Sequence, residues 1–244
     1  MAITFFWRCE GETLDGTHDY SAGDTTATAT GAVTIDAAGA KLGSNGIVTT
    51  NAADYYSFDS ASIAAIDQGC FGCWIQWKTA YPAAGLVTGV SIRDDATGFQ
   101  ALQLQTSGTD ELRFQIRSGA NILNYLTTAA TLAINNWYFV ICRWHLSQDK
   151  RAIAVYNSAG AVIQALEDTS TDLSTYIPTS VDTIRIGNPS SDVNPMWMDS
   201  VMIGSIYSDP LEDYLAYTSY TQTTSDLIDQ QPQFYKRPNT LLRM

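Results

Sequence analysis

The sequence predicts an all-β protein, a two-sheet antiparallel β-sandwich of the jelly-roll type with one short C-terminal helix and an extended tail. Three observations predict this class. Apolar and polar residues alternate in many short segments, turn-forming residues separate those segments, and the helix formers Glu and Lys are scarce. The chain has 244 residues, 45% of them hydrophobic and 16% charged. A chain of this length can bury one sizeable core, and β-sandwiches of this size often form a single domain.

Residues 112–117 and 102–105 show the alternation most clearly, with apolar side chains at every second position. This pattern is typical of an antiparallel sheet that has one face on a core and the other in water. The other predicted strands cover residues 3–9, 46–50, 70–78, 86–92, 121–127, 137–146, 151–157, 161–166, 183–187 and 196–207. A dozen short strands at such regular spacing favour a β-sandwich or jelly roll.

Two segments depart from this pattern. Residues 17–40 are rich in Thr, Ala, Gly and Asp, and we expect a long loop plus an edge strand there. Residues 208–216 begin with Ser-Asp-Pro, which suits a helix start, because Ser or Asp can cap and Pro210 fits the first helical position. The apolar residues that then repeat at helical spacing are Leu211, Tyr214 and Leu215.

We divide the chain into a sandwich over residues 1–217 and an extended arm over residues 218–244. Two prolines make the arm extended, and its last twenty residues carry three cations against two aspartates. The residues predicted to serve in assembly are Phe234, Tyr235, Lys236, Arg237, Leu241, Leu242 and Arg243. Three interpretations stay open for the arm: a frayed terminus, a segment that docks on a neighbouring subunit, or a segment that packs on its own domain.

Charge and hydropathy exclude several partners. The formal net charge is −12, so nucleic acid and anionic membranes are poor partners. No apolar run reaches the 18 residues of a membrane-spanning helix. The N-terminus lacks a basic region followed by a cleavage site, so we expect synthesis in a cytoplasm without a secretory signal.

Several fragments, in this order, resemble concanavalin A-like, laminin G-like jelly-roll domains. They lie at residues 5–15, 69–78, 136–144, 151–157, 184–188 and 198–211. The resemblance spans roughly residues 3–217 and implies two packed antiparallel sheets. Members of this family bind glycans or proteins, cleave polysaccharides or act as structural modules. The family often carries calcium, but its ligands do not map onto this sequence, and the residue after Asp199 is Ser where the family has Glu.

Catalytic patterns known on this fold are absent from the sequence. A glycosidase needs two carboxylates across a cleft, and the E-x-D-x-x-E string of related glucanases does not occur. Glu10 and Glu12 could share one face of a strand, but we interpret them as solvated. The two histidines are His18, in a loop, and His145, expected to face solvent or a sheet edge. The sequence therefore predicts that the protein is not an enzyme.

The four cysteines are Cys9, Cys70, Cys73 and Cys142. The spacing of the central pair sends them to opposite faces of a strand, which favours buried thiols over a disulfide, a metal site or a redox site.

Other side chains admit a binding role beside a structural one. Asp94 and Asp95 suit a plain turn better than a calcium site, so we expect no cofactor and leave calcium open. Core packing is favoured over a sugar-stacking platform for the six tryptophans, which are Trp7, Trp74, Trp77, Trp137, Trp144 and Trp197. The better candidates for a surface patch are Tyr55, Tyr56 and Tyr81, although simple packing is favoured for these three as well.

Together these observations predict a non-enzymatic structural or binding module. A phage virion protein, such as a head decoration, fibre or tail adhesin, reconciles an extracellular type of fold with release by lysis. The expected partners are other virion proteins, a second copy of the chain and a host surface glycan. The competing hypotheses are a polysaccharide hydrolase or lyase, and an accessory carbohydrate-binding domain of a secreted enzyme.

Overall fold

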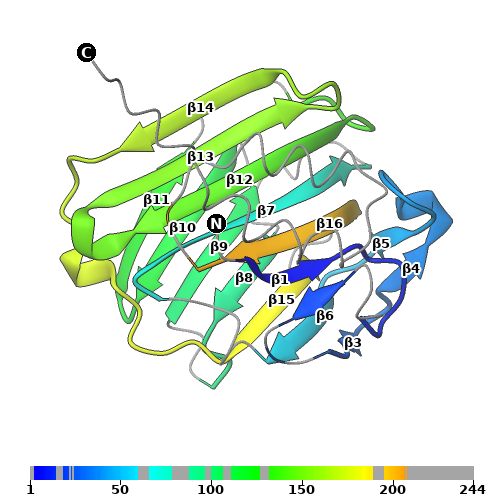
Figure 1. Ribbon diagram of the computed structural model, residues 1–244, viewed down its shortest axis with the longest axis horizontal. Helices are drawn as coiled ribbons and strands as arrows, with labels where there is room; N and C mark the ends of the chain where they lie inside the picture. Colours follow the sequence, from blue (N-terminus) through cyan, green and yellow to red (C-terminus); the bar gives the residue numbers. More distant parts are fainter. Residues whose placement is uncertain are drawn as a thin grey trace, which may run out of the picture.

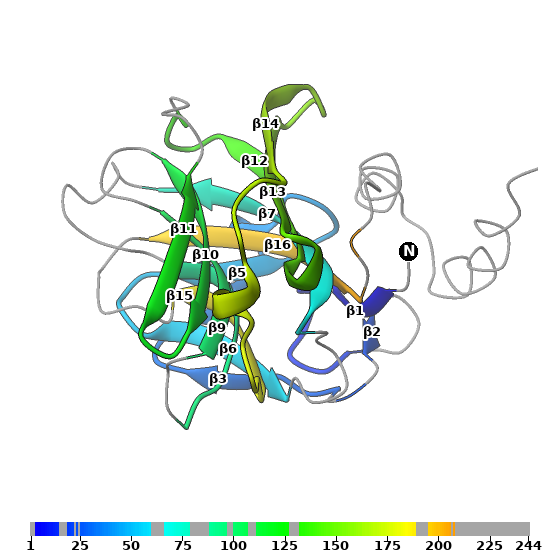
Figure 2. The same cartoon turned by 90° about the vertical axis from the view of Figure 1, so that its left-hand side faces the viewer.

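The computed structural model describes residues 3–14, 19–21, 23, 25–59, 66–78, 88–96, 100–106, 111–126, 132–188, 195–205 and 207. Over these ranges the chain forms two antiparallel sheets that face each other across one core (Figures 1 and 2). The predicted two-sheet sandwich is therefore confirmed. The predicted helix over residues 208–216 and the arm lie outside the described residues. In the described part of the chain, no helix is long and apolar enough to cross a membrane.

The first sheet has nine strands in the order β14-β13-β12-β7-β16-β1-β2, with β5 beside β16 and β4 beside β5. The first and last described strands of the chain, β1 and β16, pair with each other within this sheet. The bounds are β1 Ile3–Trp7, β2 Tyr20–Ser21, β4 Thr34–Asp36, β5 Gly46–Thr49, β7 Gln68–Trp77, β12 Trp137–His145, β13 Lys150–Asn157, β14 Val162–Asp168 and β16 Met196–Gly204.

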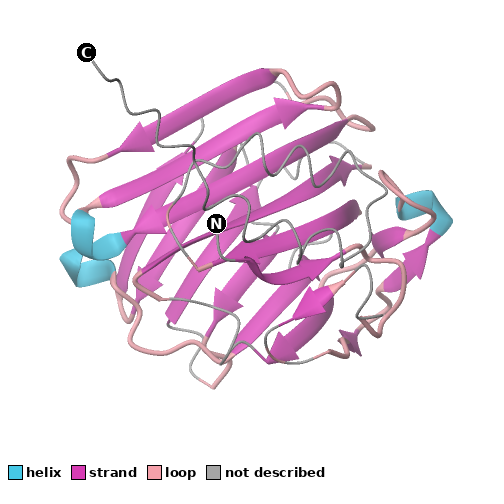
Figure 3. Ribbon diagram, in the orientation of Figure 1, coloured by secondary structure: helices cyan, strands magenta, loops and turns pink. Residues whose placement is uncertain are grey.

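The second sheet has seven strands in the order β11-β10-β9-β8-β15-β6-β3. Its bounds are β3 Thr28–Thr30, β6 Asp54–Asp59, β8 Thr88–Arg93, β9 Gln100–Thr106, β10 Leu112–Ser118, β11 Asn121–Leu126 and β15 Thr183–Asn188. Figure 3 shows short helical turns at the rims of the strand layers, namely η1 Ala37–Gly39, η2 Leu146–Gln148 and η3 Ser174–Tyr176. These strands match the sequence predictions to within a few residues, with β6 as the main addition.

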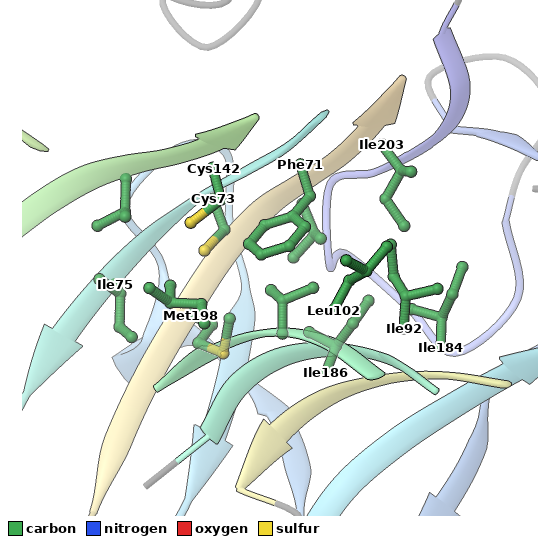
Figure 4. Close-up of a cluster of buried hydrophobic side chains, with 14 of the residues drawn as sticks. Phe71, Cys73, Ile75, Ile92, Leu102, Cys142, Ile184, Ile186, Met198 and Ile203 are labelled. Carbon is green, nitrogen blue, oxygen red and sulfur yellow. The ribbon is translucent and has the colours of Figure 1, made fainter. Parts of the chain in front are cut away.

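The core fills the space between the sheets with side chains from alternate strand positions. The Phe71 ring of β7 packs edge-on against the Phe114 ring of β10, with centroids 5.8 Å apart. Trp144 of β12 joins this pair, and all three side chains have no solvent exposure. Figure 4 shows residues of both sheets meeting in this layer, among them Phe71, Cys73, Ile92, Leu102, Cys142 and Ile184.

The cysteines follow the prediction. Cys73 lies in the core between the sheets, whereas Cys70 points to the other face of β7, and all four cysteines are buried thiols. Burial raises the pKa of the Cys73 thiol to about 12, so this thiol stays protonated.

One sequence expectation changes. The described part of residues 17–40 contains the short strands β2, β3 and β4 where a single edge strand was expected. Tyr56 packs in the core, as the favoured interpretation had it, and not in a surface patch, because it lies in β6 with 1% of its surface exposed. Alternation along β6 turns Tyr56 inward, where its ring packs edge-on against the Trp7 ring with centroids 5.4 Å apart. Tyr55 faces outward and lies under the Arg185 guanidinium at 4.5 Å.

Asp199 is a fully buried carboxylate in the last sheet strand. It lies where the pairing of β16 with β7 shifts register, next to Ser200 with its φ of 51°. Its Oδ2 accepts the backbone N–H groups of Lys41 and Leu42 at 2.7 Å each, and the Ser200 hydroxyl donates to Oδ1 at 3.0 Å. Burial raises the pKa of Asp199 to about 7, despite these hydrogen bonds.

Asp199→Asn should remove a pH dependence of stability. Because the pKa of Asp199 rises from its ordinary 3.8 to about 7 on folding, the contribution of Asp199 to the free energy of unfolding is highest below pH 4 and falls as the pH rises to 7. An amide keeps one acceptor for both backbone N–H groups and can donate to Ser200. Urea unfolding from pH 4 to 8 should therefore give a flatter profile for Asp199→Asn, with higher stability than the natural chain at pH 8.

The exposed Asp36 supplies the control, since Asp36→Asn changes the net charge equally and keeps a side-chain oxygen for the Ala38 N–H. Profiles of the natural chain and of Asp199→Asn that run parallel across this range would contradict the assignment.

Candidate functional site

An open pocket of about 390 Å³ lies beside the loop that follows β1. It combines two carboxylates, an amide, two hydroxyls and an apolar wall. The lining residues are Glu10, Gly11, Glu12, Val33, Thr34, Ile35, Asn45 and Tyr56.

The core fixes the loop that carries the two glutamates. After β1 the backbone enters the left-handed region at Cys9, with a φ of 61°, and turns away from the sheet. The fully buried Trp7 donates its Nε1–H to the Gly11 carbonyl at 2.9 Å. The Ala27 N–H donates to the Glu12 carbonyl at 2.8 Å, so the loop is also tied to a neighbouring segment.

Glu10 holds a second loop in place. Its Oε1 accepts the Ser44 N–H at 2.8 Å, its Oε2 accepts the Asn45 N–H at 3.1 Å, and the Arg8 guanidinium lies 3.8 Å from Oε1. Gly43, with a φ of +65°, approaches so closely that a Cβ there would lie 1.7 Å from Glu10 Oε1. The turn therefore requires glycine at this position. The expectation of a simply solvated Glu10 is wrong.

Glu12 is exposed, as expected, but it also has a defined partner. The Tyr56 hydroxyl donates to Glu12 Oε1 at 3.1 Å. Burial, and secondarily the Glu12 carboxylate, raise the pKa of Tyr56 far above its usual value, so the phenol remains a hydrogen-bond donor. One oxygen of an exposed carboxylate is thus held against the core by a buried phenol.

The pocket suits recognition of hydroxyl groups. Carboxylate oxygens accept hydrogen bonds from sugar hydroxyls, and the Asn45 amide and Thr34 hydroxyl can both donate and accept. Two nearby carboxylates disfavour an anionic ligand. Within the described residues, no three His, Cys, Asp or Glu side chains come together as a metal site.

The other sequence candidates are dispersed. Asp94 and Asp95 begin a turn as expected, and Asp95 pairs with Arg93 at 3.1 Å and with Arg185 at 2.8 Å. His145 is half-buried at the end of β12, with Nε2 3.8 Å from Asp67 Oδ2.

Four of the tryptophans, Trp7, Trp74, Trp77 and Trp144, are buried as expected, whereas Trp137 and Trp197 are only partly buried. His18, Tyr81 and the whole assembly arm, including Phe234, Tyr235, Lys236, Arg237, Leu241, Leu242 and Arg243, lie outside the described residues.

Sequence reasoning named Glu10 and Glu12 but missed the pocket. Its walls come from β4, β6 and the loop before β5, which are far apart in the sequence. The two-residue spacing of the glutamates was the one available signal.

No family model matches the sequence, and no match was found among curated proteins. Solved structures do share the fold. The botulinum neurotoxin serotype D binding domain gives a TM-score of 0.63 at 10% identity, over 88% of this chain and 51% of that chain. The binding domain of botulinum neurotoxin DC in complex with rat synaptotagmin II gives 0.63 at 14% identity, over 90% of this chain and 52% of that chain.

A botulinum neurotoxin type C structure, described by its interaction with two ganglioside molecules, gives a TM-score of 0.53 at 14% identity. That match covers 80% of this chain and 47% of the other. The chain thus spans about half the length of these solved chains. At such low identity the likeness shows the fold, which is a β-sandwich of the kind that these binding domains contain.

Proposed function

We propose that the protein is a non-enzymatic binding module whose pocket around Glu10, Glu12 and Asn45 recognises a neutral saccharide. The observation that carries this proposal is the set of hydroxyl-binding groups on a loop fixed by the Trp7 indole and the Tyr56 phenol. A site held rigid before binding loses little conformational entropy when a ligand enters. The structures that share the fold include binding domains described with a protein receptor and with gangliosides, which supports a binding role.

The charge of the pocket selects among saccharides. Glu10 and Glu12 both line it, and the chain carries a net charge of −12. A sialylated or uronic ligand would bring a further negative charge to these carboxylates, which costs electrostatic energy. Neutral hexose or N-acetylhexosamine oligosaccharides avoid this repulsion and offer several hydroxyl donors.

Polysaccharide hydrolysis is the competing function, and the geometry of Glu10 argues against it. A glycosidase uses one carboxyl group to donate a proton and another to attack or to activate water. Both Glu10 oxygens already accept backbone N–H groups that hold the turn at residues 44–45. Glu10 is therefore committed to loop structure. The same fold would also accommodate a polysaccharide lyase or an accessory carbohydrate-binding domain of a secreted enzyme.

We further propose that this module works on a virion surface, where the arm over residues 218–244 attaches it to a capsid or tail lattice and copies of the chain associate. The aromatic, apolar and basic composition of the arm supports this role, because such residues suit burial against another protein. The last described strand, β16, ends at Gly204, before the arm begins.

Glu12→Gln should weaken saccharide binding about tenfold, which corresponds to the loss of about one charge-assisted hydrogen bond. The probe is an array of neutral hexose and N-acetylhexosamine oligosaccharides with their sialylated counterparts, followed by calorimetry on the best neutral ligand. Glu111→Gln makes the same chemical change next to β10, away from the pocket, and should leave the affinity unchanged. Equal loss in both variants, or preference for the sialylated members, would contradict the proposed site. If the natural chain cleaves an oligosaccharide of the array and Glu12→Gln does not, the protein is instead an enzyme.

Deletion of residues 225–244 should leave the sandwich folded and abolish attachment to virions. Both described sheets are built from strands within residues 3–204, so the thermal midpoint and the circular dichroism spectrum should stay close to those of the full chain. Co-sedimentation with virions measures attachment. The oligosaccharide array separates attachment from saccharide recognition, because the shortened chain should still bind saccharide. Full attachment of the shortened chain would remove the arm from the proposal.

A further inference from the structure

Asn45 and Gly46 form the only Asn-Gly dipeptide in the sequence. In such a pair the backbone nitrogen of the glycine can attack the side-chain carbon of the asparagine, because glycine has no Cβ to hinder the approach. Asparagine is one of the chemically labile residues of proteins. Asn45 lines the pocket and immediately precedes β5, so a change in its chemistry would act directly on the candidate site.

The fold requires glycine at position 46. A Cβ on Gly46 would lie 1.9 Å from the Gly39 carbonyl oxygen and 3.0 Å from the Met198 carbonyl oxygen, and both of these atoms belong to the backbone. Gly46 also pairs with Asp36 where β4 meets β5. A side chain at position 46 is therefore not available to slow the attack, and any protection of Asn45 must come from its other neighbours.

Glu10 holds both the backbone and the side chain of Asn45. Its Oε2 accepts the Asn45 backbone N–H at 3.1 Å and the side-chain Nδ2–H at 3.4 Å. The Glu10 carbonyl accepts from the same side-chain nitrogen at 3.4 Å, and the Ser44 N–H donates to Oε1 at 2.8 Å. One glutamate thus fixes the whole turn that carries the labile amide.

These contacts oppose deamidation in two ways. Ring closure moves the Asn45 side chain onto its own backbone, so the side-chain amide must first leave both acceptors of Glu10. The attacking Gly46 nitrogen must also lose its proton, and negative charge then develops on the Asn45 side-chain oxygen. The Glu10 carboxylate, 3.4 Å from the side-chain nitrogen, makes that charge more costly.

We propose that Asn45 is a deamidation site which Glu10 protects in the folded chain, and that its conversion releases the turn from Glu10 and dismantles the pocket. The Gly46 nitrogen forms a bond to Asn45 Cγ, and the side-chain amide leaves as ammonia, which carries away the proton that Gly46 lost. Water then opens the succinimide ring at either carbonyl. The products are aspartate and isoaspartate, and water is the only co-reactant.

Neither product fits the present turn. Aspartate at position 45 replaces an amide that lies 3.4 Å from Glu10 Oε2 with a second carboxylate, so two donated hydrogen bonds give way to repulsion. Isoaspartate adds a methylene to the main chain between Ser44, which is bonded to Glu10, and Gly46, which is in contact with Gly39. In both cases the turn leaves Glu10, and the pocket loses the wall that Asn45 provides.

The first test measures where the full chain deamidates in mildly alkaline buffer. Peptide mass spectrometry gives the conversion rate at Asn45 and, in the same digest, at Asn157, which ends β13 and is followed by serine. The ratio of these rates separates local release from global unfolding, because unfolding exposes both residues. Glu10→Gln should raise the ratio at least about tenfold, since it removes the charge and weakens the hydrogen bonds of the turn. Glu111→Gln, away from the pocket, should keep the natural ratio.

Equal ratios in Glu10→Gln and Glu111→Gln would overturn the protective role of Glu10. A natural chain that converts Asn45 as fast in the folded state as in concentrated urea would overturn it as well.

The second test asks whether conversion releases the turn. Asn45→Asp reproduces one product, and hydrogen exchange at the backbone amides of residues 44 and 45 should become at least about tenfold faster than in the natural chain. Asn136→Asp makes the same change at an exposed residue that does not line the pocket, and should leave these amides unchanged. Unchanged exchange in Asn45→Asp would contradict the proposed release.

The effect on saccharide binding rests on the proposed function and has its own readout. The natural chain should lose affinity for the best neutral ligand in step with the converted fraction of Asn45. Asn45→Gln should hold its own starting affinity over the same time, because its side chain would have to close a six-membered ring. Full affinity in a converted natural chain would contradict the loss of the pocket. If no saccharide binds before ageing, the proposed function fails, and the conversion and exchange rates still decide the deamidation site.

Discussion

Burial of strand β7 on both faces is the constraint on which the rest of the molecule depends. β7 lies between β12 and β16, so both of its edges are hydrogen-bonded. Its inner face carries Phe71 and Trp77, and its outer face carries Trp74. Trp74 belongs to a second apolar cluster, the outer cluster, which consists of Phe6, Cys70, Trp74, Phe139, Ile141, Ala154, Tyr156 and Met202. Full burial of one such aromatic side chain contributes about 4–6 kcal/mol by its area. The two-sheet layer and the outer cluster therefore share one strand, and loosening either side weakens the other.

The same framework positions the pocket. Asp199 of β16 holds the backbone at residues 41–42, and Glu10 holds it at residues 44–45. One loop is thus tied at two points by two carboxylates. Its near end covers part of the outer cluster through Leu42, and its far end brings Asn45 to the pocket. Polar groups here act mainly to order the backbone, and the recognition chemistry is left to the exposed Glu12 and the groups around it.

The sequence was sufficient for the strands but not for the site. Alternation located β9 and β10, because their Leu and Phe residues face a core while Gln and Arg face out. The sequence analysis missed β6, because its adjacent tyrosines weaken the contrast between the two faces; the structure shows that Tyr56 and Phe58 face the core while Tyr55 does not. The role of Glu10 depends on amides 34 and 35 residues away, a pairing that local pattern does not encode. The apolar run of β7 was visible, yet its two-sided burial follows only from the sheet order.

Native-state hydrogen exchange resolved by residue tests this account most directly. If β7 is locked from both faces, its backbone amides should exchange only through global unfolding, with protection matching the full free energy of unfolding measured with denaturant. The edge strands β14 and β3 should exchange through smaller openings. Amides of β7 that exchange as fast as those of β14 would contradict the central position that this account gives to the strand.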